Sequence, residues 1–300
     1  VRAAAAGAMR RTGRFQHLSR DADGVSRVHF EASGAAGSGA TSVRARSIIG
    51  ADGARSQVAR QAVEGAERNP CVFAYHEIVK SPTHAADAAA ADFDASRCDV
   101  VYRGSVSPDF YGWVFPHGDT FSVGTGSADK GFSLRGAVAE LRQTAGLADF
   151  QTVRSEGAPI PMKPLPRWDN GRDVVLAGDA AGVVAPASGE GIYYAMYGGR
   201  VAADAVTEFL RSGQASALAQ ARKRFMRQHG KVFWVLGLMQ RFWYSSDKRR
   251  ERFVSICRDK DVQQLTFESY MNKELVRKKP MAHVRIFFKD VAHLLGLVRA

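Results

Sequence analysis

The chain has 300 residues, of which 45% are hydrophobic and 10% aromatic, and its formal net charge is +12. These values allow one large or two smaller folded domains and exclude an intrinsically disordered chain. The three cysteines form no Cys-x-x-Cys pair, which indicates a reducing cytoplasm and no metal site, and no apolar run is long enough for a transmembrane helix.

The N-terminal part of the chain alternates short strands with turns. We expect the end of a helix at residues 3–11, and then strands at residues 14–18, 25–31 and 41–49. Residues 34–39 (GAAGSG) follow no buried strand and open no helix. We therefore interpret them as a hairpin loop rather than a phosphate-binding loop.

Residues 48–56 (IIGADGARS) carry the first strong motif. Two branched residues end a strand, a tight turn contains Asp52 and Gly53, and Ser56 begins a helix that reaches about Gln61. Taken alone, this pattern fits either an ordinary strand–turn–helix connection or a binding turn.

The middle of the chain predicts a second, antiparallel layer with strands at residues 71–79, 99–102 and 120–125, and a loop at residues 83–97. In YGWVFP, Tyr111, Trp113 and Phe115 alternate, so they line one face of a strand. That face either packs on a core or forms an apolar wall for a long hydrocarbon. His117, two residues after Phe115, is interpreted as a surface side chain.

A buried strand then leads into a binding loop. Residues 134–144 predict an amphipathic helix, and the proline-rich residues 159–166 predict a stiff connection. Residues 174–177 (VVLA) are typical of a buried parallel strand. Gly178 and Asp179 follow at its carboxyl end, which is where open α/β sheets bind their ligands.

The small-residue loop after Asp179 contains Pro186 and ends at Gly189 and Gly191, where a long helix opens. Glycines let a backbone come close to a flat ligand, and the free N–H groups of a helix N-terminus stabilise negative charge. Asp179 can accept hydrogen bonds from hydroxyl groups. The strand end with its aspartate, the small-residue loop and the helix N-terminus follow one another in an order that suits a cofactor with a polyol chain and an electron-rich ring.

The C-terminal part of the chain is helical and basic. We expect the cofactor helix to reach about residue 210, and further helical segments at residues 218–229, 233–243, 264–275 and 281–298. Residues 221–300 hold 19 Lys or Arg and 7 Asp or Glu, whereas the first 220 residues hold 23 of each. Because no nucleic-acid motif accompanies these charges, we expect peripheral contact with an anionic membrane surface and no nucleic-acid partner.

The motif at residues 174–199 resembles the second flavin motif of the FAD-dependent superfamily that has the p-hydroxybenzoate hydroxylase fold, and residues 48–56 resemble its Asp-Gly motif. The form APASGEGIYYAMYGGR and the Tyr-x-Trp-x-Phe-Pro motif are similar to those of geranylgeranyl reductases. The C-terminal residues 251–297 resemble the branch that acts on the prenyl chains of chlorophylls and bacteriochlorophylls.

The resemblance implies an α/β (α+β) fold with FAD as cofactor. It places Asp179 at the ribitol, Gly189 and Gly191 beneath the flavin ring, and Asp52 and Gly53 near the pyrophosphate. Arg55 is a weaker candidate there. Gly178 and Pro186 are expected to bind the cofactor as well. Tyr111, Trp113 and Phe115 would line the prenyl pocket. NADPH would reduce FAD, and the substrate would be a prenylated pigment or a prenyl diphosphate. The resemblance names no proton donor.

The resemblance also implies a domain order: a partial FAD-binding domain (1–68), an antiparallel-sheet substrate domain (69–156), the second part of the FAD-binding domain (157–212) and a basic helical region (213–300). The family's Gly-x-Gly-x-x-Gly turn is absent from the sequence. We therefore expect an N-terminally incomplete or inactive chain. An aromatic monooxygenase of the same fold and a non-enzymatic lipid-binding remnant stay open as alternatives. A cytoplasmic location, with peripheral contact at the inner membrane, is expected.

Overall fold

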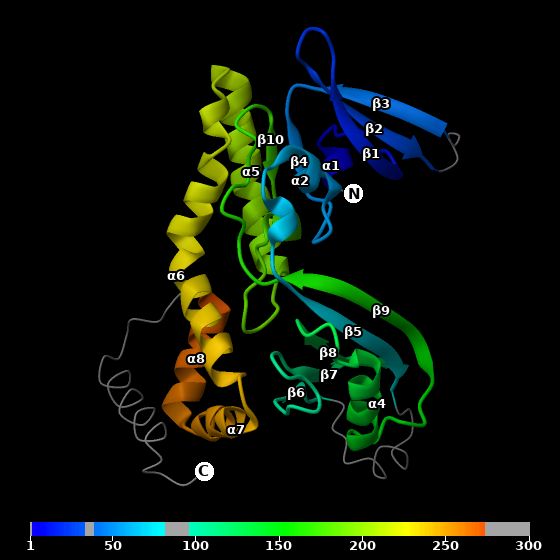
Figure 1. Cartoon of the computed structure of the whole chain (residues 1–300), viewed down its shortest axis with the longest axis vertical. Coiled ribbons are helices and arrows are strands. Elements are labelled where there is room, and N and C mark those ends of the chain that lie inside the picture. The colour runs from blue at the N-terminus through cyan, green and yellow to red at the C-terminus, as the bar shows by residue number, and fades with distance from the viewer. Residues whose placement is uncertain (1, 34–38, 82–95, 274–300) are drawn as a thin grey trace. The chain divides into compact units, whose positions relative to one another are not determined.

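The computed structural model describes residues 2–33, 39–81 and 96–273, and it divides into two compact units (Figure 1). The first unit comprises Val1–Asn69, Pro164–Val184 and Gly191–Met226. The second comprises Pro70–Lys163, Ala185–Glu190 and Arg227–Ala300. The expected helix at residues 281–298, and most of the expected loops at residues 34–39 and 83–97, lie outside the described residues.

The first unit contains a three-stranded antiparallel sheet in the order β1-β2-β3, with bounds Gly13–Arg20, Ser26–Ala32 and Gly39–Ala45. The helix before it, α1, spans only Arg2–Ala5, so the expectation of a helix to residue 11 was wrong. Its end has a local cause, because Gly7 has a φ of 87°, a left-handed conformation that ends a helical turn.

A short parallel pair forms the second sheet of this unit: β4 (Ile48–Gly50) runs beside β10 (Val174–Leu176). The strand expected at residues 41–49 is therefore two strands, β3 and β4, whereas the strand expected at residue 174 is confirmed. Helix α2 (Gln57–Ala62) packs directly on β4. A Cβ atom on Gly50 would lie 2.8 Å from the Val58 side chain, so the glycine allows this close approach.

Helix α5 (Ile192–Ser212) packs against the turn that follows β10. The turn is the 3₁₀ helix η2, and small residues on α5, including Ala195 and Gly198, let the two backbones come close. The other helical elements of the first unit, with their bounds, are η1 (Ala66–Arg68), η2 (Gly178–Ala181), η3 (Ala215–Ala217) and the start of α6, in addition to α5 (Ile192–Ser212). Trp168, Tyr194 and Phe225 are buried in this unit, and the rings of Trp168 and Tyr194 both contact Phe225.

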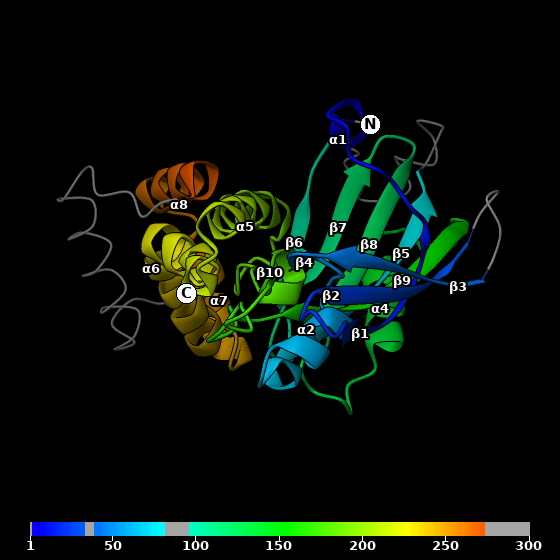
Figure 2. The same cartoon turned by 90° about the horizontal axis from the view of Figure 1, so that it is seen from above.

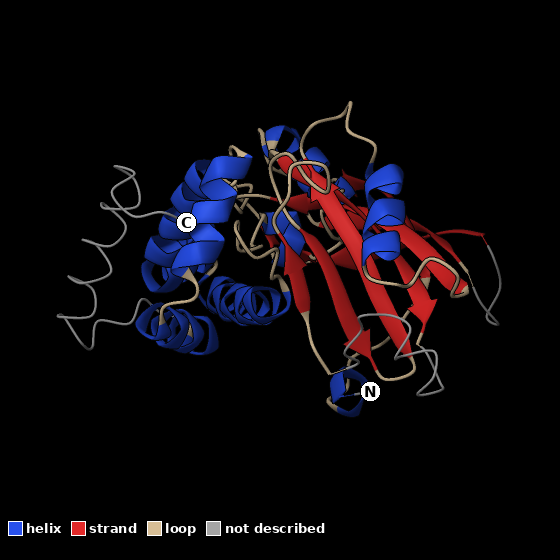
Figure 3. Cartoon of the chain, turned by 90° about the horizontal axis from the view of Figure 1, so that it is seen from below, coloured by secondary structure: helices blue, strands red, loops and turns tan. Residues whose placement is uncertain are grey.

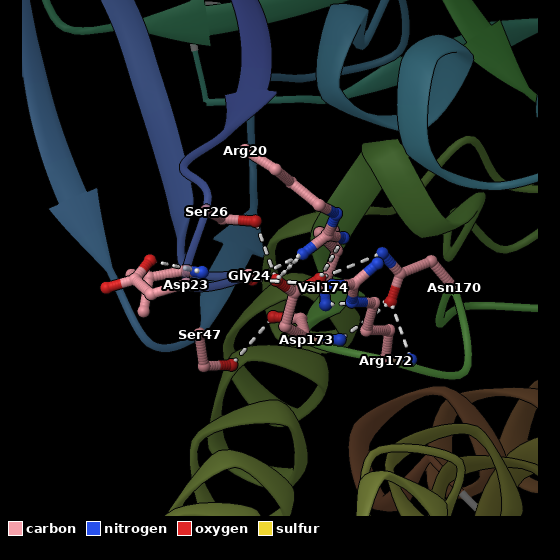
Figure 4. Close-up of polar contacts among 10 residues, drawn as sticks. Arg20, Asp23, Gly24, Ser26, Ser47, Asn170, Arg172, Asp173 and Val174 are labelled. Atoms are coloured by element: carbon pink, nitrogen blue, oxygen red, sulfur yellow. Dashed lines mark hydrogen bonds and ion pairs between the residues drawn. The ribbon is translucent and has the colours of Figure 1, made fainter.

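An ion pair between the partly exposed Arg20 and the buried carboxylate of Asp173 ties the β1–β2 hairpin to the start of β10 (Figure 4). The Arg20 guanidinium donates two hydrogen bonds, of 2.8 and 3.0 Å, to the carboxylate of Asp173. Ser26 and Asn170 donate two more. The backbone carbonyl of Asp173 in turn accepts a hydrogen bond from the N–H of Ile48, the first residue of β4. The same residue thus holds the hairpin and both strands of the parallel pair.

The second unit is built on a five-stranded antiparallel sheet in the order β6-β7-β8-β5-β9 (Figure 2). The strand bounds are β5 Cys71–Lys80, β6 Asp99–Val101, β7 Gly112–His117, β8 Thr120–Ser127 and β9 Thr152–Pro161. Strand β9 was not predicted: residues 152–158 were assigned to no element, and its last residues, 159–161, fell in the expected proline-rich connection. It lies at the edge of the sheet, which is the place where a strand tolerates proline.

Helix α4 (Leu134–Thr144), which the sequence predicts correctly, covers one face of this sheet against β8 and β5 (Figure 3). Its Val138 and Leu141 join Val114 and Val123 in a buried core. A second core contains Tyr111 and Trp113, so the consecutive residues Trp113 and Val114 of β7 contribute to different cores.

Three helices complete the second unit: the rest of α6 (Gln220–Trp243), α7 (Asp247–Ile256) and α8 (Lys260–Asn272). Two segments expected to be separate, 218–229 and 233–243, form the one helix α6, in which Gly230 is an interior residue. Helix α7 was not predicted, and α8 begins four residues earlier than expected. Its N-terminus is fixed by Asp259, whose side chain accepts hydrogen bonds from the N–H groups of Asp261 and Val262.

Candidate functional site

The carboxyl ends of β4 and β10 lie side by side, because the strands are parallel and in register from Val174 opposite Ile48 to Leu176 opposite Gly50. The Ala177 N–H donates to the Gly50 carbonyl just beyond the pair. The two motifs identified in the sequence therefore start from the same edge of one sheet, although they are far apart in the chain. A ligand that lies along this edge could meet both of them.

At the end of β4, Asp52 organises the turn into α2. Its carboxylate accepts hydrogen bonds from the Ser56 hydroxyl and from the N–H groups of Gln57 and Val58. Ser56 is the N-cap of α2 and accepts from the Ala59 N–H. Gly53 supplies the turn with a φ of 80°. The local role of Asp52 is thus to hold the turn, and its neighbour Arg55 is exposed.

At the end of β10, Asp179 stands in a different environment. It is half-buried, and burial is the cause that raises the pKa of its carboxyl. Among the described residues, no group donates a hydrogen bond to that carboxylate and none forms an ion pair with it. A half-buried acid without a partner costs folding free energy unless a ligand supplies the donors.

Glycines keep the space beside Asp179 open. Gly178 has a φ of 61°, which turns the chain sharply after the strand. A Cβ atom on Gly191 would lie 3.4 Å from Oδ1 of Asp179 and 3.3 Å from the Val184 side chain. Gly191 is also the N-cap residue of α5, and no side chain caps that end. The first N–H groups of a 21-residue helix therefore start beside the unpartnered carboxylate.

Residues 185–190 belong to the second unit, and they form a compact turn that lies between Gly178 and Gly191 in the sequence. The Ala185 N–H donates to the Glu190 carbonyl, and the Gly189 N–H donates to the Ala185 carbonyl. Two buried tyrosines clamp the turn: the Tyr111 hydroxyl donates to the Ser188 carbonyl, and the Tyr244 hydroxyl donates to the Ala187 carbonyl.

Gly189 and Pro186 pack inside this clamp. Gly189 has a φ of 65°, and a Cβ atom there would lie 3.1 Å from the Phe110 ring. Pro186 is buried, and it lies against Gly237 of α6. Burial raises the pKa of the Tyr111 hydroxyl and that of Tyr244, so both remain neutral donors at physiological pH.

Tyr111, Trp113 and Phe115 form a row of contacting rings. The centroids of Tyr111 and Trp113 are 6.0 Å apart, and those of Trp113 and Phe115 are 6.4 Å apart. The structure thus brings these three residues together, and it links the row to the turn through the Tyr111 hydroxyl. His117 is exposed at the end of β7.

The orientation of Trp113 depends on two residues that the sequence reasoning did not identify. Gly124 lies opposite Trp113 on β8, and a Cβ atom there would lie 2.3 Å from an indole carbon, so only a glycine leaves room for the ring. The Trp113 indole N–H donates to Ser122 Oγ, which is 2.9 Å from His76 Nδ1. The Gly-x-Gly at residues 124 and 126 was the available signal for this role of β8.

Comparison with known proteins gives consistent results. The family model described as "Lycopene cyclase protein" matches residues 4–279. A geranylgeranyl diphosphate reductase from Rhodobacter capsulatus is 53% identical over 99% of this chain and 73% of its own length. The chain belongs to the geranylgeranyl reductase family.

Other members of the geranylgeranyl reductase family are more distant. The geranylgeranyl diphosphate reductase from Synechocystis is 36% identical and the chloroplastic one from Oryza sativa is 34% identical. The chain spans 61% and 58% of their lengths, respectively. It therefore corresponds to only part of these relatives.

Among solved structures, a geranylgeranyl bacteriochlorophyll reductase-like protein from Thermoplasma acidophilum matches with a TM-score of 0.70 at 20% identity, over 94% of this chain and 68% of that chain. A probable FAD-dependent monooxygenase from Pseudomonas aeruginosa matches with a TM-score of 0.51 at 22% identity, over 81% and 65%. These matches confirm the expected fold: a mixed α/β, p-hydroxybenzoate hydroxylase-like fold of FAD-binding proteins.

The structure also bears on the membrane. None of the helices that it describes is both long enough and apolar enough to cross a bilayer.

Proposed function

We propose that this chain is part of an FAD-dependent reductase that acts on the double bonds of geranylgeranyl chains, with NADPH as the electron donor. The observation that carries the proposal is the half-buried carboxylate of Asp179, which has no partner among the described residues and lies beside the uncapped start of α5. The names of the relatives, above all the one that is 53% identical, support the type of reaction.

The residues at the ends of β4 and β10 fit FAD. Hydroxyl groups of the ribityl chain would supply the donors that Asp179 lacks, in the space that Gly178 and Gly191 leave open. The N–H groups at the start of α5 would stabilise negative charge on the reduced ring. Asp52 and Gly53 would hold the neighbouring turn beside the pyrophosphate. When bound and reduced by NADPH, FAD would supply the hydride to one carbon of a double bond, and a proton would have to reach the neighbouring carbon to complete the reduction.

The residues of the second unit fit the substrate side. Tyr111, Trp113 and Phe115 would form the wall along which the prenyl chain lies, and they would exclude water from it. Gly189 and Pro186, in the clamped turn, would support the flavin ring. An isolated alkene accepts hydride poorly, so holding it in place supplies much of the catalysis.

We propose a prenylated (bacterio)chlorophyll or geranylgeranyl diphosphate as the substrate. Trp234 and Leu238 on α6 are 70% and 55% exposed, and Lys231 and Arg241 flank them. Exposed apolar residues among basic ones are typical of a helix that lies on an anionic bilayer surface. We therefore also propose that residues 221–300 bring the protein to a membrane that contains its substrate.

The test is an anaerobic incubation of the purified protein with FAD, NADPH and geranylgeranyl diphosphate or geranylgeranylated pigment, followed by mass spectrometry. We expect products heavier by two hydrogens for each double bond reduced. Oxygen-dependent NADPH oxidation with a hydroxylated aromatic product would instead identify a monooxygenase of the same fold. Prenyl binding without reduction would identify a lipid-binding protein.

A further inference from the structure

A hollow of about 720 Å³ lies in the second unit, at the junction of α7 and α8. Cys257, the C-cap residue that follows α7, forms one part of it. Residues of α8 form the rest of the described lining, among them Gln263, Phe267 and Tyr270 at helical spacing. Its volume is within the range of about 300–1,000 Å³ that is typical of small-molecule sites. Nothing in the function proposed above uses this hollow.

The lining of the hollow is mainly apolar. Val262, Phe267 and Tyr270 provide hydrocarbon and aromatic surface, and Phe267 and Tyr270 are 65% and 50% exposed. Large exposed rings gathered around one concavity mark a binding site better than isolated ones do. Lys260 is the charged side chain among the described lining residues, and its aliphatic stem can lie on apolar surface while its ammonium group reaches water.

The hollow and the aromatic row border the same apolar core. Val262, which lines the hollow, packs in the same core as Tyr111 and Trp113. Tyr270 is near enough to Tyr111 to contribute, after burial and Tyr102, to raising the pKa of the Tyr111 hydroxyl. Helix α8 therefore lies near the row.

An ion pair fixes α8 beside the clamped turn. Lys273 Nζ is 2.5 Å from the Glu190 carboxylate and 3.8 Å from the Tyr270 ring centroid, and both charged side chains are largely buried. Lys273 has a φ of 55°, and it is the non-glycine residue with positive φ among those described. Such a conformation persists only where its surroundings hold it. The end of α8 is thus held against the turn that we propose supports the flavin ring.

We propose that the hollow on α8 binds part of the isoprenoid chain of the substrate, as a continuation of the wall formed by Tyr111, Trp113 and Phe115. This inference rests on the proposed function and deepens it, because it adds Val262, Phe267 and Tyr270 to the residues that determine which chain is accepted. Aromatic and aliphatic side chains recognise a polyisoprenoid through its apolar surface, without any need for a fixed hydrogen bond.

Cys257 provides a direct test of binding. In the purified protein, the rate at which a small neutral thiol reagent modifies Cys257 is measured by mass spectrometry, with the exposed Cys98 as internal control. We expect geranylgeranyl diphosphate and geranylgeraniol to slow modification of Cys257 at least about fivefold and to leave Cys98 unchanged, because an occupied hollow covers the thiol. Protection by inorganic diphosphate alone would place an anion at Lys260 and overturn the proposal.

A charge placed in the hollow provides the second test. Phe267→Asp should raise the KM for geranylgeranyl diphosphate about tenfold with little change in kcat, because the apolar chain would have to lie against a carboxylate. Val153→Asp, at an exposed position of the edge strand β9 outside the hollow, is the matched control and should leave KM unchanged. FAD content should be the same in both variants.

The outcomes separate the two proposals. Protection of Cys257 without any reduction of the chain would keep the binding site and refute the reductase function. Reduction with an unchanged KM in Phe267→Asp and an unprotected Cys257 would overturn the site and keep the function.

Discussion

The substitution Asp173→Asn tests how the ion pair between Arg20 and Asp173 positions the candidate site. The Asp173 side chain is 7% exposed, so burial alone would raise the pKa of its carboxyl. The hydrogen bonds from Arg20, Ser26 and Asn170 outweigh burial and lower that pKa from 3.8 to about 2. A shift of this size corresponds to about 2 kcal/mol of folding free energy at neutral pH.

The sign of the pH dependence follows from the direction of the shift. The folded-state pKa lies below the unfolded-state value, so the contribution is complete above about pH 5 and disappears as the pH falls toward the folded-state pKa. We expect Asp173→Asn to lower the free energy of unfolding by about 2 kcal/mol at pH 7 and by about 1 kcal/mol at pH 3. The variant and the wild type should converge in acid, because protonated Asp173 resembles asparagine.

The assay is urea-induced unfolding at a series of pH values, followed by tryptophan fluorescence and circular dichroism. Asp204→Asn is the control, because Asp204 forms a long, exposed ion pair with Arg224 that contributes little to stability. A difference between Asp173→Asn and wild type that stays constant from pH 7 to pH 3 would refute the reasoning. So would a difference no larger than that of the control.

Three further substitutions test other contacts. Gly124→Ala places a Cβ atom 2.3 Å from the Trp113 ring, so it should lower the free energy of unfolding by about 1–3 kcal/mol and shift the tryptophan fluorescence. The control Gly199→Ala, which has nothing within 4 Å of the added Cβ atom, should not destabilise the protein. Equal thermal stability of the two variants would contradict this packing. Tyr111→Phe removes the donor to the Ser188 carbonyl and should cost about 1 kcal/mol in chemical denaturation, and no loss would mean that the clamp is not formed. Trp234→Ser should weaken sedimentation with anionic lipid vesicles about tenfold, and unchanged sedimentation would count against the proposed membrane surface.

The sequence predicted the parts of the fold that depend on neighbouring residues. The strand before Gly178, the turn at Asp52 and helix α4 follow from local apolar patterns, glycines and caps, and all three are present. The errors also have local causes. The helix expected to end at His229 continues through Gly230 in α6, and the proline-rich connection expected from residue 159 begins inside the edge strand β9.

The contacts that position the candidate site could not be predicted in this way. Arg20 and Asp173 are 153 residues apart in the sequence, and Tyr111 and Ser188 are 77 apart. No pattern in a single sequence indicates which distant groups meet. The alternation of Tyr111, Trp113 and Phe115 did predict a common face, but the support from Gly124 and the extension toward α8 depend on strand register and helix packing.

The most direct test of the proposed function is the amount of FAD bound by Asp179→Asn, compared with wild type and with Asp204→Asn. We expect FAD affinity to fall at least about tenfold in Asp179→Asn, because the acceptor loses its charge, and to stay unchanged in Asp204→Asn. Since burial raises the pKa of the Asp179 carboxyl, its ionised form costs folding free energy. The flavin-free variant should therefore be no less stable than flavin-free wild type. Asp179→Asn that binds FAD as well as Asp204→Asn would contradict the account.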